Sequence, residues 1–318
     1  MNPDVSVIIP TFNRLWSLPE AVESCRNTKC RTEIIVIDDG STDGTWPWLE
    51  QQPDVIRFRQ TNRGKTWAAN YGFAQAQGEY VRFLDSDDWC LPEANDSQIN
   101  VARATGADIV VSGYTVFSEE AIPLETHPWV PCDDFIAQQL GECENSHYSA
   151  YLFRRAFIQD IPHRPDFAFR DDRMFVLESA LKHPSVAVSD LPALGHRHHG
   201  RERLQFRLGI RMAVTNYQHS MVYRTILAEL ARRGELTERR KKAAAKVLWT
   251  LAHWIGYTHS MDAEEVADWV CELDPAFQPP ERGLLGTLYR RLGFRRTEAI
   301  LRGRRVVKRW LGRTPRDR

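Results

Sequence analysis

The chain has 318 residues, of which 42% are hydrophobic and 26% charged, an ordinary balance for a globular protein. Its formal net charge is zero, so the composition gives no indication of a nucleic-acid partner and we expect none. No apolar run approaches the roughly 20 residues needed to span a bilayer, which limits any expected membrane contact to a peripheral one.

The zero net charge hides an asymmetry between the end of the chain and the rest. Residues 283–318 contain 12 Lys and Arg against 2 Asp and Glu, a net charge of +10, which leaves −10 for the remainder. Apolar residues recur at helical spacing in this tail. The pattern predicts a basic amphipathic helix that contacts an anionic membrane surface. A helix packed on the protein with a solvated basic face, or a disordered tail, are the alternatives.

Cysteine spacing and the start of the chain indicate the compartment. The six cysteines form no C-x-x-C pair, which disfavours a zinc ribbon or a thioredoxin-type motif, and they read as scattered reduced thiols. Neither a basic segment nor a long apolar run precedes the first strand-like segment at Val5, so we expect no secretory signal. The expected location is the cytoplasm, with peripheral attachment to the inner face of the cytoplasmic membrane if the tail binds lipid.

Strand and helix signals alternate along the first part of the chain. Predicted strands cover residues 5–10, 33–37, 55–59, 80–84 and 109–114, and predicted helices cover 17–27, 45–52, 66–77 and 96–105. Gly78 is expected to cap the third of these helices. Strands that alternate with helices imply βαβ units, and therefore an α/β fold with a mostly parallel sheet flanked by helices.

A change of pattern near residue 204 marks a C-terminal helical region. Long helices are predicted over residues 204–233 and 237–259, on either side of Gly234. Asp262 and Glu265 have the spacing of a capping box that opens a third helix, which stops before Pro275. We therefore expect an α/β catalytic domain over residues 1–203, a helical accessory region over 204–280 and a basic tail over 281–318.

Acidic clusters follow two of the predicted strands. Asp38 and Asp39 end the second strand, and Asp85-Ser86-Asp87-Asp88 ends the fourth. Ligands of open parallel sheets bind beyond the carboxyl ends of the strands. Carboxylates there can hold Mg²⁺ or Mn²⁺ or accept hydrogen bonds from a nucleobase or a ribose. Turns with capping aspartates are the structural alternative for both clusters.

Four segments in this order carry a resemblance to a known family. They read VSVIIPTFNR from Val5, IIVIDDGSTDGT from Ile34, NRG and AANYG between Asn62 and Gly72, and GEYVRFLDSDD from Gly78. Together they resemble the nucleotide-sugar-binding half of family-2 glycosyltransferases, over about residues 4–200. The resemblance implies a Rossmann-like GT-A fold that uses Mn²⁺ or Mg²⁺ and a nucleotide diphosphate sugar, with UDP the expected nucleotide.

The resemblance also implies roles for individual residues. The expected nucleotide-sugar contacts are Pro10, Thr11, Asn13, Asp38, Asp39, Asn62, Gly64, Asn70, Asp85, Ser86 and Arg197. The expected metal ligands are Asp87, Asp88 and His199. Two departures are visible. The family's A-R-N segment reads Ala68-Ala69-Asn70 and lacks its arginine, and the serine that often follows the family's histidine segment is replaced around Glu202.

Two later segments complete the predicted site. The segment from Phe169 to Phe175 resembles the family's E-D-x-x-F motif, which makes Asp172 the expected general base and places Asp171 at the position of the glutamate. In the His196–His199 tetrad, His199 is the best match for the metal ligand and Arg197 for a phosphate contact, with His196 and His198 as alternates. A surface helix start and solvated loop histidines are the respective structural alternatives.

The predicted function is inverting transfer of a sugar from the nucleotide donor to an acceptor hydroxyl. A glycan or a lipid-linked acceptor in envelope polysaccharide synthesis suits the basic tail. A sugar nucleotidyltransferase is the competing enzyme, although such enzymes usually carry a glycine-rich basic signature near the N-terminus, where VSVIIPTFNR stands. A catalytically degenerate protein that binds sugar nucleotides is the non-enzymatic alternative.

Overall fold

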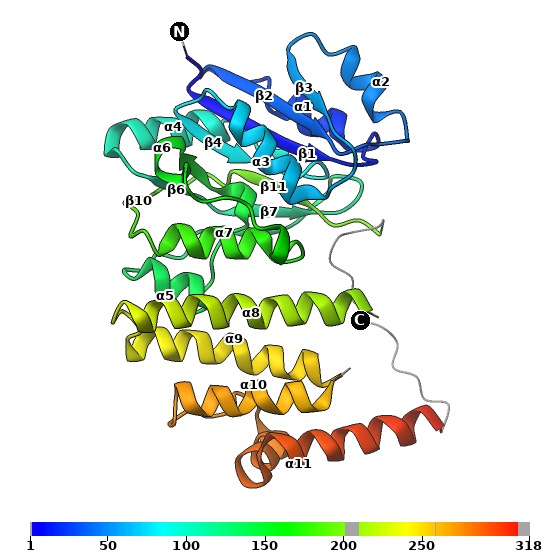
Figure 1. Cartoon of the computed structure of the whole chain (residues 1–318), viewed down its shortest axis with the longest axis vertical. Coiled ribbons are helices and arrows are strands. Elements are labelled where there is room, and N and C mark those ends of the chain that lie inside the picture. Colours follow the sequence, from blue (N-terminus) through cyan, green and yellow to red (C-terminus); the bar gives the residue numbers. More distant parts are fainter. Residues whose placement is uncertain (1, 201–209, 258, 311–318) are drawn as a thin grey trace. The chain divides into compact units, whose positions relative to one another are not determined.

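The structure is a computed structural model that describes residues 2–200, 210–257 and 259–310, without the side chains of 260 and 304–310. The chain forms two compact units. The first comprises Met1–Gln139 and Cys143–Gln205, and the second comprises Leu140–Glu142 and Phe206–Arg318. Figure 1 shows an α/β first unit and an all-helical second unit, as the sequence pattern predicts.

The first unit alternates strands and helices along the chain (Figure 1). Its strands are β1 Val5–Thr11, β2 Thr32–Asp38, β3 Val55–Arg59, β4 Tyr80–Phe83, β5 Trp89–Cys90, β6 Ile109–Val111, β7 Tyr114–Phe117, β8 Pro123–His127, β9 Leu152–Arg154, β10 Val186–Val188 and β11 Leu194–Arg197. Its helices are α1 Leu18–Ser24, α2 Thr45–Glu50, α3 Lys65–Gln75, α4 Ala94–Thr105, α5 Phe135–Leu140, η1 Tyr148–Ala150, α6 Arg155–Ile158, η2 Pro165–Phe167 and α7 Asp171–Ala180.

The main sheet has seven strands in the order β10-β6-β9-β4-β1-β2-β3. β1 pairs in parallel with β2 and β4, and β3 and β10 also pair in parallel with their neighbours, whereas β9 runs antiparallel to β4 and β6. The predicted mostly parallel α/β sheet is therefore confirmed. In the register of β1 and β2, Thr11 lies opposite Asp38, so the two strands end together.

Both faces of the central strand β1 are buried, which explains why this strand reads as a nearly continuous apolar run. Successive side chains of a strand point to opposite faces. Val7 and Ile9 of β1 therefore pack in one cluster with α1 and α4, while Ile8 packs in the other with α3 and α7. Layers of helices on both faces hold the sheet rigid, and so fix the positions of the loops at its carboxyl edge.

A second, four-stranded sheet, in the order β5-β11-β7-β8, was not expected. The single strand predicted over 109–114 is wrong, because the chain breaks between β6 and β7. At the break, a Cβ on Gly113 would lie 2.4 Å from the carbonyl oxygen of His127. β7 pairs with β8 and β11, and β11 pairs with β5 through Gly195 and Trp89. This pairing brings the histidine tetrad beside the acidic cluster 85–88.

The predicted cap at Gly78 is also wrong. Helix α3 ends at Gln75 with Ala76 as its C-cap. Gly78 instead lies against β1, where its N–H donates to Ser6 Oγ at 2.8 Å and an added Cβ would lie 2.5 Å from Ser6 N. A close approach of two backbones, and not a helix terminus, requires glycine here.

Among its described residues, the second unit contains four helices. They are α8 Ile210–Arg232, α9 Glu238–Gly256, α10 Ser260–Leu273 and α11 Gly283–Trp310. The predicted helix start at 204 lies outside the described residues. The predicted capping box is wrong, because His259 is the N-cap of α10 and Asp262 lies inside the first turn. No helix in the described part of the chain is long and apolar enough to cross a membrane.

The basic tail begins as helix α11, which bends at Gly293. Tyr289, Phe294 and Glu298 of this helix are buried. His253 of α9 pairs with Glu298 at 3.0 Å, and Tyr289 Oη donates to the same carboxylate at 2.6 Å. One face of the helix therefore packs on α9 within the second unit. On this helix Arg290, Arg291, Arg295 and Arg296 are exposed.

Candidate active site

The candidate site lies at the carboxyl edge of the main sheet, where β1, β2 and β4 end. Thr11 ends β1 and is buried, and its carbonyl accepts a hydrogen bond from Asp39 N–H at 2.8 Å. Thr11 Oγ1 is buried and has no hydrogen-bond partner among the described residues. An unsatisfied buried hydroxyl is costly, so it marks a place where a ligand atom would complete the hydrogen bonding.

Asn13, which is also predicted to contact the nucleotide sugar, joins the loops after β1 and β2. It adopts a left-handed conformation with φ of 52°. Its backbone N–H donates to Ser41 Oγ at 2.8 Å, and its side-chain oxygen accepts from Thr42 N–H at 2.7 Å. The adjacent Pro10 is buried within β1 opposite Ile37. Asn13 thus holds the loops after β1 and β2 together, and Pro10 packs inside the sheet.

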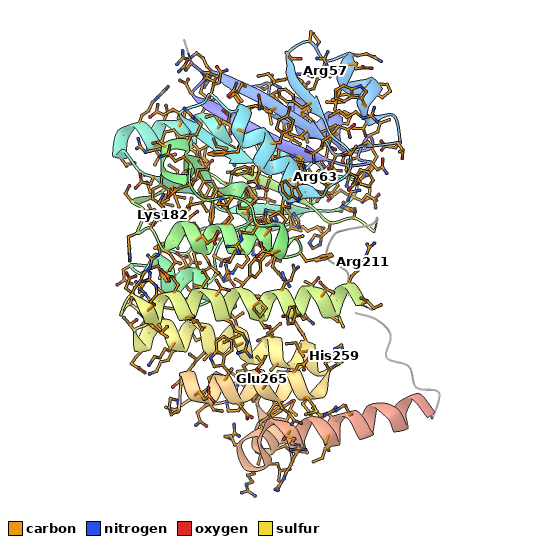
Figure 2. The ribbon with its side chains drawn as sticks, in the orientation of Figure 1. Arg57, Arg63, Lys182, Arg211, His259 and Glu265 are labelled. Carbon is orange, nitrogen blue, oxygen red and sulfur yellow. The ribbon has the colours of Figure 1, made fainter. Side chains whose placement is uncertain are left out.

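The carboxylates after β2 are engaged by the chain itself. Asp38 is fully buried, accepts from Ser41 N–H and pairs with Arg59 at 3.2 Å. Asp39 accepts from the backbone N–H of Arg63 and of Gly64, each at 2.8 Å. Asp39 thereby closes the loop before α3, in which Gly64 has a φ of 98° that favours glycine. The exposed Asn62 lies in this same loop, and Arg63 projects from it, as Figure 2 shows.

The D-x-D segment follows β4. Asp85, Asp87 and Asp88 each place one carboxylate oxygen within 4.8 Å of the others. Asp85 forms an ion pair with Lys65 at the start of α3. The buried Ser86 contributes its carbonyl oxygen, which accepts from Ser17 Oγ at 2.8 Å and fixes the turn to the start of α1.

Asp87 is held ionised by its surroundings. Burial raises the pKa of this carboxyl, but the hydrogen bond from His199 and the charges of Arg14 and Lys65 lower it by more, so that the pKa of Asp87 lies well below its ordinary value. His199 Nε2 lies 3.1 Å from the carboxylate, and Arg14 Nε lies at 3.8 Å. A carboxylate that stays ionised is suited to cation binding.

The histidine tetrad divides between two carboxylates. His199 contacts Asp87, whereas His196 contacts Asp88 through Nδ1 at 3.0 Å. His198 is exposed, and its backbone N–H bonds Phe117. His199 is therefore the histidine that contacts the D-x-D segment through Asp87. That His199 binds the metal stays a prediction.

Arg197 is buried and engaged with the chain's own groups. Its guanidinium pairs with Glu20, donates to the carbonyls of Asp87 and Glu119, and lies 4.7 Å from the centroid of the Trp89 ring. In this arrangement it braces the D-x-D turn. The phosphate contact expected of Arg197 stays a prediction.

The acidic cluster fits a hard divalent cation. Mg²⁺ and Mn²⁺ prefer oxygen ligands and usually take one or two carboxylates along with substrate phosphates. The cluster supplies three carboxylates, and His199 lies beside it with Nε2 3.1 Å from Asp87. The donor set of Asp85, Asp87, Asp88 and His199 is therefore chemically suited to Mn²⁺ in particular, which accepts imidazole as well as oxygen.

The two aspartates at the start of α7 have different surroundings. Asp171 is buried, bonded to His163 Nδ1 at 2.5 Å and to the backbone N–H of Arg164. His163 in turn bonds Tyr148 Oη through Nε2 at 2.9 Å. Asp172 is half-buried, and its carboxylate accepts from Arg173 N–H at 2.8 Å. Asp171 thus anchors the helix start, which leaves Asp172 as the carboxylate that can meet a substrate.

Asn70, which is predicted to contact the nucleotide sugar, bonds the backbone of His163, the residue that holds Asp171. Its side-chain amide donates to the carbonyl of His163 and accepts from the N–H of the same residue, each at 2.8 Å. Helix α3 therefore fixes the loop that holds Asp171. This role of Asn70 is indirect, because it positions the start of α7.

Lys65 links the D-x-D segment to the candidate base, and the sequence reasoning missed it. Burial lowers the pKa of Lys65, but the charges of Asp85 and Asp172 raise it by more, so that its net pKa lies above the ordinary value. Lys65 precedes Ala69 by one helical turn, and residues at this spacing share a helix face. Lys65 therefore supplies a cation near the place where the family's A-R-N arginine is missing. Its position directly after the quoted NRG segment was the available signal.

His147 is a second residue that the sequence reasoning missed. It precedes η1 and packs against His196, with ring centroids 4.8 Å apart. Burial lowers the pKa of His147, and the charge of Asp88 opposes this effect. No sequence motif marks His147, because its proximity to the acidic cluster depends on the tertiary fold.

A Rossmann-like sheet with a carboxylate cluster at its carboxyl edge defines a class of nucleotide-sugar-binding α/β proteins. The model of the glycosyl transferase family 2 matches residues 6–161 of this chain. EpsH of Bacillus subtilis, which carries a glycosyltransferase name, is 27% identical over 76% of this chain and 73% of its own length. The poly(ribitol-phosphate) beta-N-acetylglucosaminyltransferase TarP of Staphylococcus aureus is 32% identical, over 35% of this chain and 37% of TarP.

A solved structure shares the fold of this chain. A crystal structure of S. aureus TarS residues 1–349 in complex with UDP-GlcNAc superposes with a TM-score of 0.65, at 18% identity, over 94% of this chain and 91% of that one. The chain belongs to glycosyl transferase family 2 and has the GT-A fold. The chain spans less than two thirds of the length of several curated relatives that it matches, TarP among them.

Proposed function

We propose that the protein is an inverting glycosyltransferase that moves a sugar from a UDP donor to an acceptor hydroxyl. The observation that carries the proposal is the convergence of Asp172 and the D-x-D segment on Lys65. Asp85 is paired with this lysine, and the charge of Asp172 acts on it as well. The electrostatic influence of Asp172 on a lysine that is paired with the D-x-D segment supports placing the base and the diphosphate site in one active site.

The reaction is a single displacement. Asp172 removes the proton from the acceptor hydroxyl as that oxygen attacks the anomeric carbon, which is general-base catalysis. The new carbon–oxygen bond forms on the face opposite the nucleotide while the bond from the anomeric carbon to the phosphate oxygen breaks, and UDP leaves with that electron pair. A divalent cation held by Asp85, Asp87, Asp88 and His199 would neutralise charge on the diphosphate. Thr11 Oγ1, with Asp39 nearby, lies where the nucleoside is expected.

UDP-N-acetylglucosamine is the donor to test first. The TarS structure is titled as a complex with UDP-GlcNAc, and TarP is named as an N-acetylglucosaminyltransferase that acts on poly(ribitol phosphate). These names support a UDP-sugar donor and an envelope glycan or lipid-linked acceptor. A binding screen of UDP-, GDP- and dTDP-sugars with Mn²⁺ tests the choice of nucleotide.

Removal of the Asp87 carboxylate should weaken the metal-dependent part of donor binding. In calorimetry, Asp87→Asn should bind UDP in the presence of Mn²⁺ at least about tenfold more weakly than the wild type, a loss of about 1.4 kcal/mol. The matched variant Asp172→Asn should bind UDP and Mn²⁺ like the wild type, because Asp172 is assigned to the acceptor side. Equal binding by Asp87→Asn and the wild type would reject the metal assignment.

We also propose that the tail brings the enzyme to an anionic membrane surface. The described part of helix α11 exposes apolar residues as well as arginines, with Leu284 77% and Ile300 49% exposed. Basic amphipathic helices bind anionic lipid surfaces by this combination. The protein cut after Pro280 should lose flotation with phosphatidylglycerol vesicles that the full chain retains. If both proteins float equally, the tail is not the membrane contact.

The degenerate binding protein remains the competing proposal, because the A-R-N arginine is absent. Slow release of UDP from a UDP-sugar in the presence of Mn²⁺ would distinguish an active transferase from a protein that only binds. Membership of family 2 argues against the sugar nucleotidyltransferase.

A further inference from the structure

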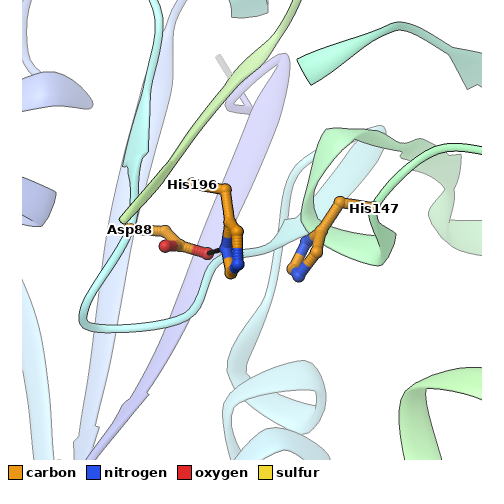
Figure 3. Close-up of side chains that lie close together, drawn as sticks. All are labelled: Asp88, His147 and His196. Carbon is orange, nitrogen blue, oxygen red and sulfur yellow. Dashed lines mark hydrogen bonds and ion pairs between the residues drawn. The ribbon is translucent and has the colours of Figure 1, made fainter. Parts of the chain in front are cut away.

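Two histidines and one aspartate meet beside the D-x-D cluster. Asp88 follows β4, His147 precedes η1, and His196 lies in β11 (Figure 3). One carboxylate oxygen and one ring nitrogen from each histidine lie within 4.8 Å of one another. Residues 88, 147 and 196 are distant in sequence, so the three-dimensional fold alone creates this group.

The surrounding contacts hold the three side chains in place. Asp88 is buried and accepts from the backbone N–H of Arg197 at 2.8 Å through one oxygen, while its other oxygen lies 3.0 Å from His196 Nδ1. The His147 ring is tilted by 31° to that of His196, and the Tyr114 ring lies 6.1 Å and 6.5 Å from the two. Figure 3 shows both imidazoles on the same side of the Asp88 turn.

From this geometry we infer that Asp88, His147 and His196 form a binding site for a borderline divalent cation such as Zn²⁺, distinct in chemistry from the oxygen-rich cluster of Asp85 and Asp87. Two imidazoles and a carboxylate suit Zn²⁺, whereas carboxylates alone suit Mg²⁺ and Mn²⁺. Tetrahedral zinc with bonds of about 2.0–2.1 Å needs ligand atoms about 3.3 Å apart. The three ligand atoms, which lie within 4.8 Å of one another, would have to close to this spacing on binding.

Zinc binding replaces the proton that Asp88 and His196 share. In the metal-free protein the imidazole N–H of His196 donates to the Asp88 carboxylate, and the cation takes the place of this proton between the same two atoms. The neutral imidazole then carries its one proton on Nε2 and binds the cation through Nδ1, so ligation needs no net release of a proton. Because Asp88 belongs to both groups, Zn²⁺ competes there with the oxygen-bound cation that the proposed function assigns to the cluster.

Titration of the full, metal-free chain with Zn²⁺ alone tests the inference, by competition with a chromogenic chelator. We expect one tight Zn²⁺ per chain and a loss of at least about tenfold in affinity in His147→Ala and in His196→Ala. His127→Ala is the matched control, because His127 stacks on Tyr114 at 4.7 Å but does not belong to the group. That variant should bind Zn²⁺ like the wild type.

Three results would overturn the inference. The first is unchanged Zn²⁺ affinity in both histidine variants. The second is a loss of Zn²⁺ binding in Asp85→Asn with none in His147→Ala, which would place the ion in the oxygen cluster. The third needs no variant: Co²⁺ in the wild-type chain should give the intense visible absorption of tetrahedral nitrogen and oxygen ligands, and a weak octahedral spectrum would contradict the assignment. Since no donor or acceptor is present, these outcomes are independent of whether the transferase proposal holds.

Discussion

At the scale of single residues, Lys65 is the side chain on which the site most depends. Its ammonium group is paired with Asp85 and lies in the field of Asp172. Lys65→Ala should lower the turnover number by about 10²-fold, because a positioned charge near the reacting groups is lost. Lys65→Arg keeps the charge and should restore most of the activity. Wild-type turnover in folded Lys65→Ala would show that the reaction does not depend on the lysine's charge.

The same residues show how far the sequence could predict the site. Asp85, Asp87 and Asp88 lie together after β4, because they belong to one short motif, whereas the contact of His199 with Asp87 was expected only from the family resemblance. The contacts of Asp39, Asn70 and Arg197 with the chain itself were not predictable, since each depends on a loop that is distant in sequence. His147 was missed for this reason as well.

At the scale of elements, Asp4 joins the start of β1 to the loop before β2 and to α4. Its carboxylate bonds Arg31 and Arg103, each at 2.7 Å, and accepts from Arg31 N–H at 2.9 Å. The hydrogen bond from the Arg31 side chain holds the pKa of Asp4 below its ordinary value. Asp4→Asn should therefore lower the free energy of unfolding at neutral pH by about 1–3 kcal/mol, as measured by urea denaturation.

The pH dependence of this effect has a defined sign. A carboxyl whose pKa is lowered in the folded state stabilises it above the unfolded value of about 3.9, and this stabilisation is lost as pH falls through the folded value. The difference between the wild type and Asp4→Asn should accordingly shrink below about pH 4. Asp54→Asn is the control, because the exposed Asp54–Arg26 pair should contribute less than about 1 kcal/mol. A difference for Asp4→Asn that stays constant down to pH 3 would contradict the assignment.

Elements of regular pattern were predicted well, and those that depend on tertiary contacts were not. The strand predicted over 55–59 is β3, Val55–Arg59, because its β-branched run lies between turn residues. β5 has only two residues, too few to give a pattern, and the break at Gly113 arises from the close passage of His127. The second sheet therefore could not be read from the chain.

At the scale of the whole molecule, the composition and motifs predicted the succession of an α/β part and a helical part, and the two compact units have that character. The finer division into a catalytic domain over 1–203, a helical region over 204–280 and a tail over 281–318 stays a proposal. Within the second unit, α11 packs on α9 through His253 and Glu298 and still exposes four arginines. Both readings of the tail, a packed helix and a lipid-binding face, are compatible in one helix.

Inverting transfer with Asp172 as the base can be followed by proton NMR of the sugar released from UDP-N-acetylglucosamine. With Mn²⁺ and water as the acceptor, the α-linked donor should give the β anomer of N-acetylglucosamine first, before mutarotation mixes the anomers. Asp172→Asn should release sugar at least about 10²-fold more slowly, because it lacks the general base. First appearance of the α anomer, or release by Asp172→Asn at the wild-type rate, would contradict the account.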